Sequence, residues 1–273
     1  MKIFSCLKGK KKRQSISQPL ISAMGYQTYS LQGIGTRKRQ EDAFALLNDC
    51  DVLKIQEKGL FAIVADGMGG MADGKAASSM AVASLLECFA QIDWKKDPVG
   101  QLKYAVHFAA DGVYHLLRGQ GGSTVVACMI HGERLWFASV GDSGLYLLRE
   151  HQLNRLNRPH NMRHEIYLRE IRAGHADPSI GRDHLETDAL TSFLGMEAME
   201  DVDLLLRPLQ LEPGDVLLLC SDGVSGTLSE DALAACLEQE TPQYSCIAME
   251  QEIFKCALPH QDNYTAVVIR CVK

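Results

Sequence analysis

The sequence predicts an α+β fold in layers, with antiparallel sheets covered by helices. Short apolar runs bounded by Gly, Asp or Asn indicate strands, and longer stretches with an apolar residue every three or four positions indicate helices. These segments come in groups: two helices follow one strand, then a run of strands, then two helices and a final strand. This order differs from the strict strand–helix alternation that is typical of a doubly wound parallel sheet.

The predicted elements follow from these two patterns in chain order. Strands are expected at 60–65, 123–130, 135–140, 145–148, 202–207, 216–220 and 264–271. Helices are expected at 74–91, 98–117, 229–238 and 243–257. The stretch 150–191 is charged, rich in His and Arg, and has no clear periodicity, so we expect irregular structure there, near the site or as a surface excursion.

The length of 273 residues fits one large domain, since neither an internal repeat nor a long linker is seen. We expect a single domain at 22–273. The preceding residues 1–21 are basic and then rich in Ser and Gln, which predicts a disordered tail. The tail is either simply solvated or a contact for a membrane surface or a partner, with Cys6 acylated.

Charge and composition exclude several classes of protein. The net charge is −6, and the tail is basic, so the rest of the chain carries roughly −12. An acidic body argues against nucleic-acid binding and suits a protein that concentrates cations. Nine cysteines without a C-x-x-C pair indicate thiols in a reducing compartment. With no apolar run long enough to span a membrane and no secretory signal, we expect a cytoplasmic location. We also expect a monomer.

Aspartates recur where predicted strands end or begin. Asp66, Asp142 and Asp222 each follow an apolar run and precede a Gly or Ser turn, and Asp262 leads into the last strand. Asp42 follows a basic cluster. Any one Asp-Gly pair is usually a plain turn. Several at strand ends bring oxygen ligands to one place, which is what Mg²⁺ and Mn²⁺ require, so the pattern predicts a shared metal site.

Two other patterns are weaker. The stretch 69–76 nearly matches the phosphate-binding loop G-x-x-x-x-G-K-[ST], but Ala76 lacks the hydroxyl that would bind Mg²⁺, and a nucleotide hydrolase would leave the aspartates unexplained. His160 and His164 are spaced like zinc ligands, yet no H-E-x-x-H order is present, so we expect a solvent-facing pair.

In order and spacing, these residues resemble the metal-dependent serine/threonine protein phosphatases of type 2C, the PPM family, and especially the compact bacterial members. The resemblance covers roughly residues 24–271. It rests on motifs that match R-x-x-N-E-D, D-G-M-G-G, G-[ST]-T, G-D-S-R, L-G, S-D-G and a closing D-N, which stand here as 37–42, 66–70, 122–124, 141–144, 194–195, 221–223 and 262–263.

The resemblance implies a central β-sandwich of two antiparallel sheets flanked by helices, with two Mn²⁺ or Mg²⁺ ions at one edge. Asp66 would bridge both ions, and Arg37 would bind the substrate phosphate. A water activated by the ions would attack phosphorus directly, without a phosphoenzyme. The remaining metal ligands would be Asp42, the Gly67 carbonyl, Asp222 and Asp262, with Asp142 and Asp222 holding a weaker third ion.

The implied activity is hydrolysis of phosphoserine and phosphothreonine on proteins, opposing a Ser/Thr kinase. The segment 150–191 corresponds to the variable flap of the family. The chain departs from the family pattern at Gln40 in place of Asn, Gly144 in place of Arg, and Met68, which cannot act as the histidine general acid of some eukaryotic members. A binding module of the same fold without turnover is the alternative, but such a protein would be expected to lose its aspartates.

Overall fold

A computed structural model describes residues 24–69, 73–175, 189–199 and 201–273. Strand β3 (Leu60–Ala65) shows why the sequence folds in layers, because all of its residues are buried. Alternate side chains of a strand point to opposite faces. Leu60, Ala62 and Val64 therefore lie in one apolar cluster, while Phe61 and Ile63 lie in another. A strand covered on both faces belongs to the middle of a layered structure.

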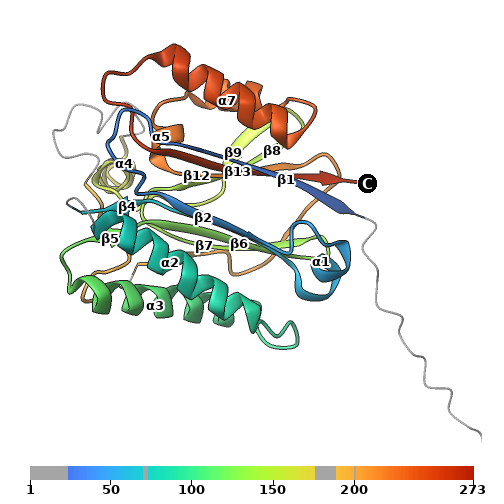
Figure 1. Cartoon of the computed structure of the whole chain (residues 1–273), viewed down its shortest axis with the longest axis horizontal. Coiled ribbons are helices and arrows are strands. Elements are labelled where there is room, and N and C mark those ends of the chain that lie inside the picture. Colours follow the sequence, from blue (N-terminus) through green and yellow to red (C-terminus); the bar gives the residue numbers. More distant parts are fainter. Residues whose placement is uncertain (1–23, 70–72, 176–188, 200) are drawn as a thin grey trace, which may run out of the picture.

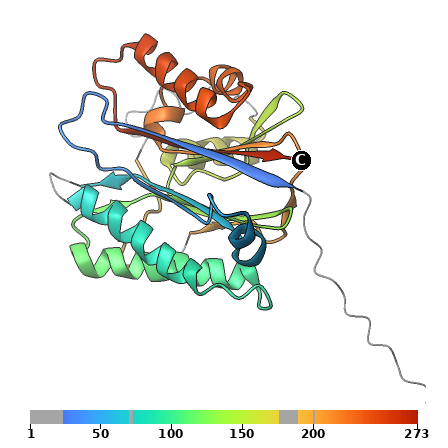
Figure 2. The ribbon, with the colours of Figure 1, turned by 45° about the vertical axis from the view of Figure 1, so that its right-hand side comes forward.

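Two antiparallel sheets form the centre of the molecule (Figures 1 and 2). In the described residues, the first sheet has the order β1-β13-β12-β8-β9 and the second β10-β7-β6-β3-β2, with β11 also pairing with β7. The bounds of these strands are β1 Gly25–Gly33, β2 Ala43–Leu47, β6 Val125–His131, β7 Arg134–Val140, β8 Gly144–Arg149, β9 Gln152–Arg155, β10 Asp203–Leu204, β11 Leu209–Gln210, β12 Val216–Cys220 and β13 Tyr264–Val272. A short ribbon pairs β4 (Gly67–Met68) with β5 (Gly122–Ser123).

Helices cover the outer face of each sheet. One apolar cluster joins the second sheet to α2 (Asp73–Ala90) and α3 (Pro98–Leu117), and another joins the first sheet to α6 (Glu230–Leu237) and α7 (Pro242–Cys256). A third cluster fills the space between the sheets. The helices lie above and below the sandwich in Figures 1 and 2. The predicted sandwich flanked by helices is confirmed.

Predicted and observed elements agree best where the chain is buried. The strands at 60–65 and 216–220 and the helix at 98–117 have the predicted bounds. The predicted strand at 202–207 is reduced to β10, because only Asp203 and Leu204 pair with β7.

The expectation that 150–191 is irregular was wrong for part of it. This stretch contains β9, which pairs with β8, and α4 (Met162–Arg172). Helices α1 (Val52–Lys58) and α5 (Asp222–Ser225) and strands β1 and β2 were also not predicted. The proposed tail at 1–21 lies outside the described residues.

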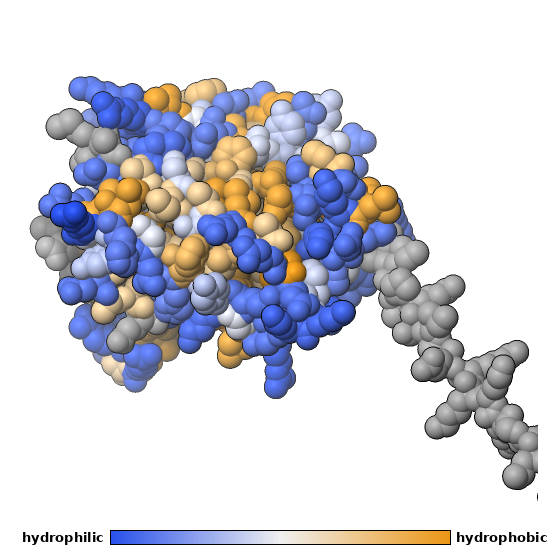
Figure 3. All heavy atoms as spheres, turned by 60° about the horizontal axis from the view of Figure 1, so that its bottom comes forward, coloured by the Kyte–Doolittle hydropathy of each residue, from blue (hydrophilic) through white to orange (hydrophobic). Residues whose placement is uncertain are grey.

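The surface over α2 and α3 is of mixed character. Figure 3, which brings this side of the molecule forward, shows apolar side chains gathered near the middle of the face with hydrophilic ones around them. Tyr104 and Phe108 are among the exposed apolar residues of α3. Within the described part of the chain, no helix combines the length and the apolar character needed to cross a membrane.

Candidate metal centre and active site

The aspartates singled out in the sequence come together at one end of the sandwich. Asp66 follows β3, and Asp222 follows β12 as the first residue of α5. Asp142 lies in the turn between β7 and β8, and Asp262 lies just before β13. All four line one cavity of about 460 Å³, together with Arg37 and Gly67. Because the strands belong to both sheets, the cavity lies across the two layers.

Asp42 lies beneath this cavity and is fully buried. Its Oδ2 accepts hydrogen bonds from Ser221 Oγ at 2.8 Å and Thr265 Oγ1 at 2.7 Å. Its Oδ1 is buried and has no hydrogen-bond partner in the described residues. Burial raises the pKa of Asp42, while the Thr265 and Ser221 hydroxyls act in the opposite direction. A buried carboxylate oxygen without a donor is costly unless a cation binds it.

The carboxyl of Asp66 is strongly affected by its neighbours. Burial raises its pKa well above the ordinary value, and the charges of Asp42 and Asp222 add to the rise. Its main chain is fixed from both directions, since its N–H donates to Thr124 Oγ1 at 3.1 Å and its carbonyl accepts from Thr124 N–H at 2.8 Å. Asp66 is therefore held rigidly among groups that disfavour its ionisation.

Asp142 shows an effect of the same kind. Burial and the nearby Asp222 charge raise the pKa of Asp142 to about 6, against a hydrogen bond from Asn161. Several neighbouring carboxyls with raised pKa values indicate a site that lacks positive charge.

Glycines allow the chain to pass close to the site. A Cβ on Gly67 would lie 2.0 Å from the carbonyl oxygen of Gly74, and one on Gly223 would lie 1.8 Å from that of Asn263. No side chain fits at either position. The glycines that follow Asp66 and Asp222 therefore permit main-chain contacts that keep these two aspartates at the cavity.

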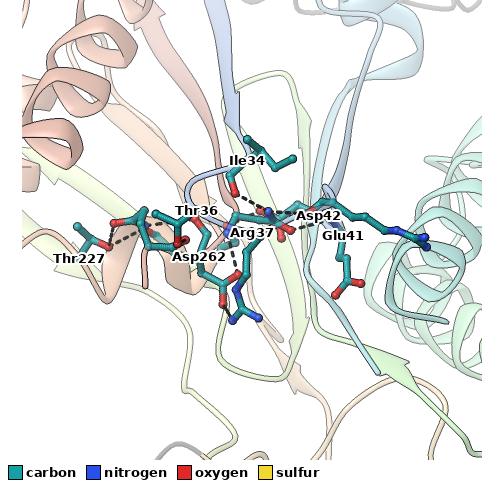
Figure 4. Close-up of polar contacts among 12 residues, drawn as sticks. Ile34, Thr36, Arg37, Glu41, Asp42, Thr227 and Asp262 are labelled. Atoms are coloured by element: carbon teal, nitrogen blue, oxygen red, sulfur yellow. Dashed lines mark hydrogen bonds and ion pairs between the residues drawn. The ribbon is translucent and has the colours of Figure 1, made fainter. Parts of the chain in front are cut away.

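Arg37 reaches the cavity from the loop after β1 (Figure 4). Its Nη2 lies 2.5 Å from Asp262 Oδ2, and its side chain is 58% exposed. Asn263 organises the same loop: it accepts a hydrogen bond from Glu41 N–H at 2.7 Å and donates to the carbonyls of Ile34 and Arg39 at 2.9 and 3.0 Å. Arg37 is thus an accessible cation on a loop that the D-N motif anchors.

The residue set fits divalent cations by its chemistry. It offers hard carboxylate oxygens, one of which is buried and unpartnered in Asp42, and a surplus of negative charge around Asp66. The carboxylates surround one cavity, although no three His, Cys, Asp or Glu side chains of the described ranges meet at a single point.

Several residues of the site were not predicted as functional. Glu41, Thr124, Leu190 and Phe193 line the cavity, and Thr265 contacts Asp42 from β13. Glu41 and Thr124 lie inside recognised motifs, which could have pointed to them. Leu190, Phe193 and Thr265 carry no signal of their own, because only the folded chain brings them here.

The departures from the family pattern have local explanations. Gln40 accepts a hydrogen bond from Asp42 N–H at 2.9 Å and donates to Gly33 O at 2.9 Å, so it fixes the approach to β2. A Cβ at Gly144 would lie 2.4 Å from the ring of Tyr146, which occupies the space that a side chain there would need. Met68 lies at the cavity wall.

The expectation of a solvent-facing histidine pair was wrong for His160. This residue is fully buried, and its Nδ1 accepts the Gly141 N–H at 3.1 Å. His164 is half-buried and lines a neighbouring cavity. His160 therefore supports the turn that carries Asp142.

Comparisons with known proteins point to one family. The family model described as "Protein phosphatase 2C" matches residues 34–258. A serine/threonine phosphatase, stp, from Listeria monocytogenes is 31% identical over 188 residues, which is 65% of this chain and 71% of that protein.

Solved structures show the same fold. PppA of Pseudomonas aeruginosa, described as a key regulatory component of T6SS, superposes with a TM-score of 0.71 at 28% identity, covering 90% of this chain and 98% of that one. The catalytic domain of the serine/threonine phosphatase PstP in complex with two manganese ions gives a TM-score of 0.72 at 24% identity, covering 92% and 100%.

The chain belongs to the protein phosphatase 2C family, because the family model spans most of its length and the fold and the order of motifs agree with it. The family and the class of enzyme predicted from the sequence, a metal-dependent serine/threonine protein phosphatase, are confirmed.

Proposed function

We propose that the chain hydrolyses phosphoserine and phosphothreonine in proteins at a centre of two divalent ions, Mn²⁺ or Mg²⁺. The observation that carries this proposal is the convergence of Asp66, Asp222 and Asp262 with Arg37 around one cavity, above the buried Asp42. The presence of two manganese ions in PstP, a protein of the same fold, supports the assignment of the metal.

We assign the ligands of the two ions to Asp42, Asp66, the Gly67 carbonyl, Asp222 and Asp262, and those of a weaker third ion to Asp142 and Asp222. When bound, the ions would stabilise the charge on the phosphoryl oxygens and supply a water that is nucleophilic at neutral pH. Asp66 would hold the ions together with Asp42 and Asp222, whose charges act on its carboxyl.

Arg37 orients the substrate in this scheme. Its planar guanidinium can donate two parallel hydrogen bonds to a phosphate. In the structure these donors face Asp262. Occupation of Asp262 by an ion would free Arg37 for the phosphate, so metal binding and substrate binding would favour each other.

The substrates would be proteins phosphorylated by a Ser/Thr kinase that this enzyme opposes. The named activity of the Listeria relative supports that class of substrate. A monomeric state and a cytoplasmic location remain predictions from the sequence.

The test is hydrolysis of p-nitrophenyl phosphate and of a phosphothreonine peptide with Mn²⁺, with Mg²⁺ and with EDTA. We expect activity only with metal, and a loss of at least about 100-fold in Asp66→Asn and Asp222→Asn. Asp231→Asn, which makes the same change on the exposed surface of α6, should retain full activity. A folded protein that binds the peptide but hydrolyses neither substrate with any metal would instead be a binding module.

A further inference from the structure

A second cavity opens beside the candidate active site. It has a volume of about 540 Å³ and shares Asp142 and Asp222 with the first, so these two residues form a common wall. Its other side is built from β9, the loop after it, α4 and α5. In Figure 1, α4 and α5 lie at the same end of the sandwich as β4 and β5.

The two cavities differ in the charge of their walls. Among the described residues that line the first cavity, Arg37 is the cation, and the other charged side chains are carboxylates. The second cavity is lined by Arg155 and Arg163. Among its described lining residues, the acidic ones are Asp142 and Asp222 of the common wall. Asn161, Tyr167 and Ser225 add polar groups that can donate hydrogen bonds.

Arg155 is held in place as a permanent feature of this wall. Its Nη2 donates to Asp142 O at 2.7 Å, and its guanidinium lies 5.6 Å from the centre of the Tyr146 ring. These contacts keep its charge at the boundary between the two cavities. An Arg fixed before binding loses little entropy when an anion arrives.

Helix α4 adds to the positive character. Its first turn carries Arg163 and His164, and Asn161 caps it by accepting from His164 N–H at 3.1 Å. The N-terminal end of a helix carries partial positive charge. Burial lowers the pKa of His164, and the charges of Arg158 and Arg155 act in the same direction while Glu165 opposes them.

We propose that this second cavity binds an acidic residue of the substrate polypeptide, Asp or Glu, within a few residues of the phosphorylated one. This inference rests on the proposed phosphatase function. Because the cavities share a wall, a chain whose phosphate lies in the first can place a neighbouring side chain in the second. A carboxylate there pairs with Arg163 and Arg155, and the ions proposed for Asp142 and Asp222 remove the repulsion from the common wall.

The experiment measures kcat/KM of the Mn²⁺-loaded full chain on phosphothreonine peptides. One neutral parent peptide is compared with variants that carry a single Glu, or a single Gln, at each position from four before to four after the phosphothreonine. We expect Glu at one or two positions to raise kcat/KM about tenfold over Gln, as a charge-assisted hydrogen bond would. The preference should decline as salt is raised.

Variants of Arg163 identify the cavity. Arg163→Gln should bring the ratio of Glu to Gln peptides close to one, and Arg163→Glu should favour a peptide with Lys at the same position. The ratio does not depend on how much active enzyme each variant retains. Arg169→Gln, the same change on the same helix outside the cavity lining, should keep the wild-type ratio.

The outcomes separate the two proposals. Equal kcat/KM for Glu and Gln peptides at every position would overturn the inference alone, as would a preference that persists in both Arg163 variants. Failure to hydrolyse any peptide, including the neutral parent, with any metal would overturn the proposed function and this inference with it.

Discussion

At the scale of single residues, the surroundings of Asp42 suit the role of cation ligand that we propose for it. The Ser221 and Thr265 hydroxyls occupy one of its oxygens and leave the other without a partner. Thr265 Oγ1 also accepts a hydrogen bond from Gln32 at 3.2 Å, which directs its own proton toward Asp42. Residues of this kind orient a ligand without touching the ion.

Thr265→Val should weaken metal binding, because it removes a hydrogen bond that orients Asp42 while preserving the shape of the side chain. We expect the Mn²⁺ concentration for half-maximal activity to rise about 10–100-fold, with a parallel loss of affinity in a calorimetric titration. Thr265→Ser, which keeps the hydroxyl, is the control and should stay close to wild type. An unchanged Mn²⁺ affinity in Thr265→Val would show that Thr265 does not position Asp42.

His160 gives a prediction about pH. Burial lowers its pKa below the ordinary 6.5, and Arg158 adds to the effect against the opposing charge of Asp201. The unfolded chain therefore takes up a proton at a higher pH than the folded protein. The stability associated with neutral His160 is fully present above pH 6.5 and is lost as the pH falls below it.

His160→Asn removes this titration and keeps an acceptor oxygen near the Gly141 N–H. The wild-type free energy of unfolding should fall more steeply than that of the variant between pH 7 and pH 5.5. Denaturant unfolding at several pH values measures both slopes, so any constant cost of the substitution cancels. Parallel pH curves for the two proteins would contradict the assignment.

At the scale of elements, short helix α5 places Asp222. Ser221 precedes it, and Ser221 N–H donates to Thr265 O at 3.0 Å, which joins the start of the helix to β13. Gly223 then lies against the Asn263 carbonyl, where a Cβ would approach to 1.8 Å. The S-D-G and D-N motifs thus contact each other through their main chains.

Gly223→Ala should separate these two motifs and displace both Asp222 and Asp262. We expect a loss of about 1–3 kcal/mol in the free energy of unfolding, as for other overpacked sites, and a large loss of phosphatase activity. Gly112→Ala in α3 is the control, since the nearest atom to its new Cβ would be Ser84 Oγ at 3.3 Å, followed by the flexible side chain of Met80. If Gly223→Ala keeps the wild-type melting temperature and activity, α5 can shift to admit the new Cβ without a loss of stability.

The helices and strands that the sequence patterns did not predict share a physical feature, which is the lack of a clear apolar periodicity. Strands β1 and β2 are only partly buried, so their apolar pattern is weak, although they pair with β13 and β3. Helix α4 has Ile166 as its buried residue and therefore lacks an apolar stripe. Local signals were present, since Asn161 caps α4 and Asp51 caps α1. A capping residue alone does not predict a helix when no apolar periodicity follows it.

At the scale of the whole molecule, the candidate metal centre joins the two sheets. Asp42 and Asp66 flank strands of one sheet, Asp222 and Asp262 flank strands of the other, and Asp142 lies in the turn that connects them. Like charges at this junction oppose the packing of the sheets in the absence of a cation. Cations should therefore stabilise the sandwich as a unit.

Mn²⁺ should raise the melting temperature, and EDTA should reverse the effect. At 100 times its Kd, an ion that binds only the folded state adds about 2.7 kcal/mol, which is roughly 5–10 °C for a chain of this size. Asp66→Asn should abolish the shift, whereas Asp231→Asn should retain it. Scanning calorimetry with and without Mn²⁺ tests this independently of activity, and an equal shift in Asp66→Asn would place the ions elsewhere.

The layered α+β class, the buried strands and the motif-borne residues from Arg37 to Asp262 could be predicted before the structure was known, because they depend on apolar runs and on short motifs that are local in the chain. The tertiary structure alone brought Asp42 beneath the cavity, joined Thr265 to it and placed Arg155 beside Asp142. It also formed the second cavity from β9 and α4, where the sequence shows no periodicity. These contacts join residues far apart in the chain, and only the packing of the two sheets defines them.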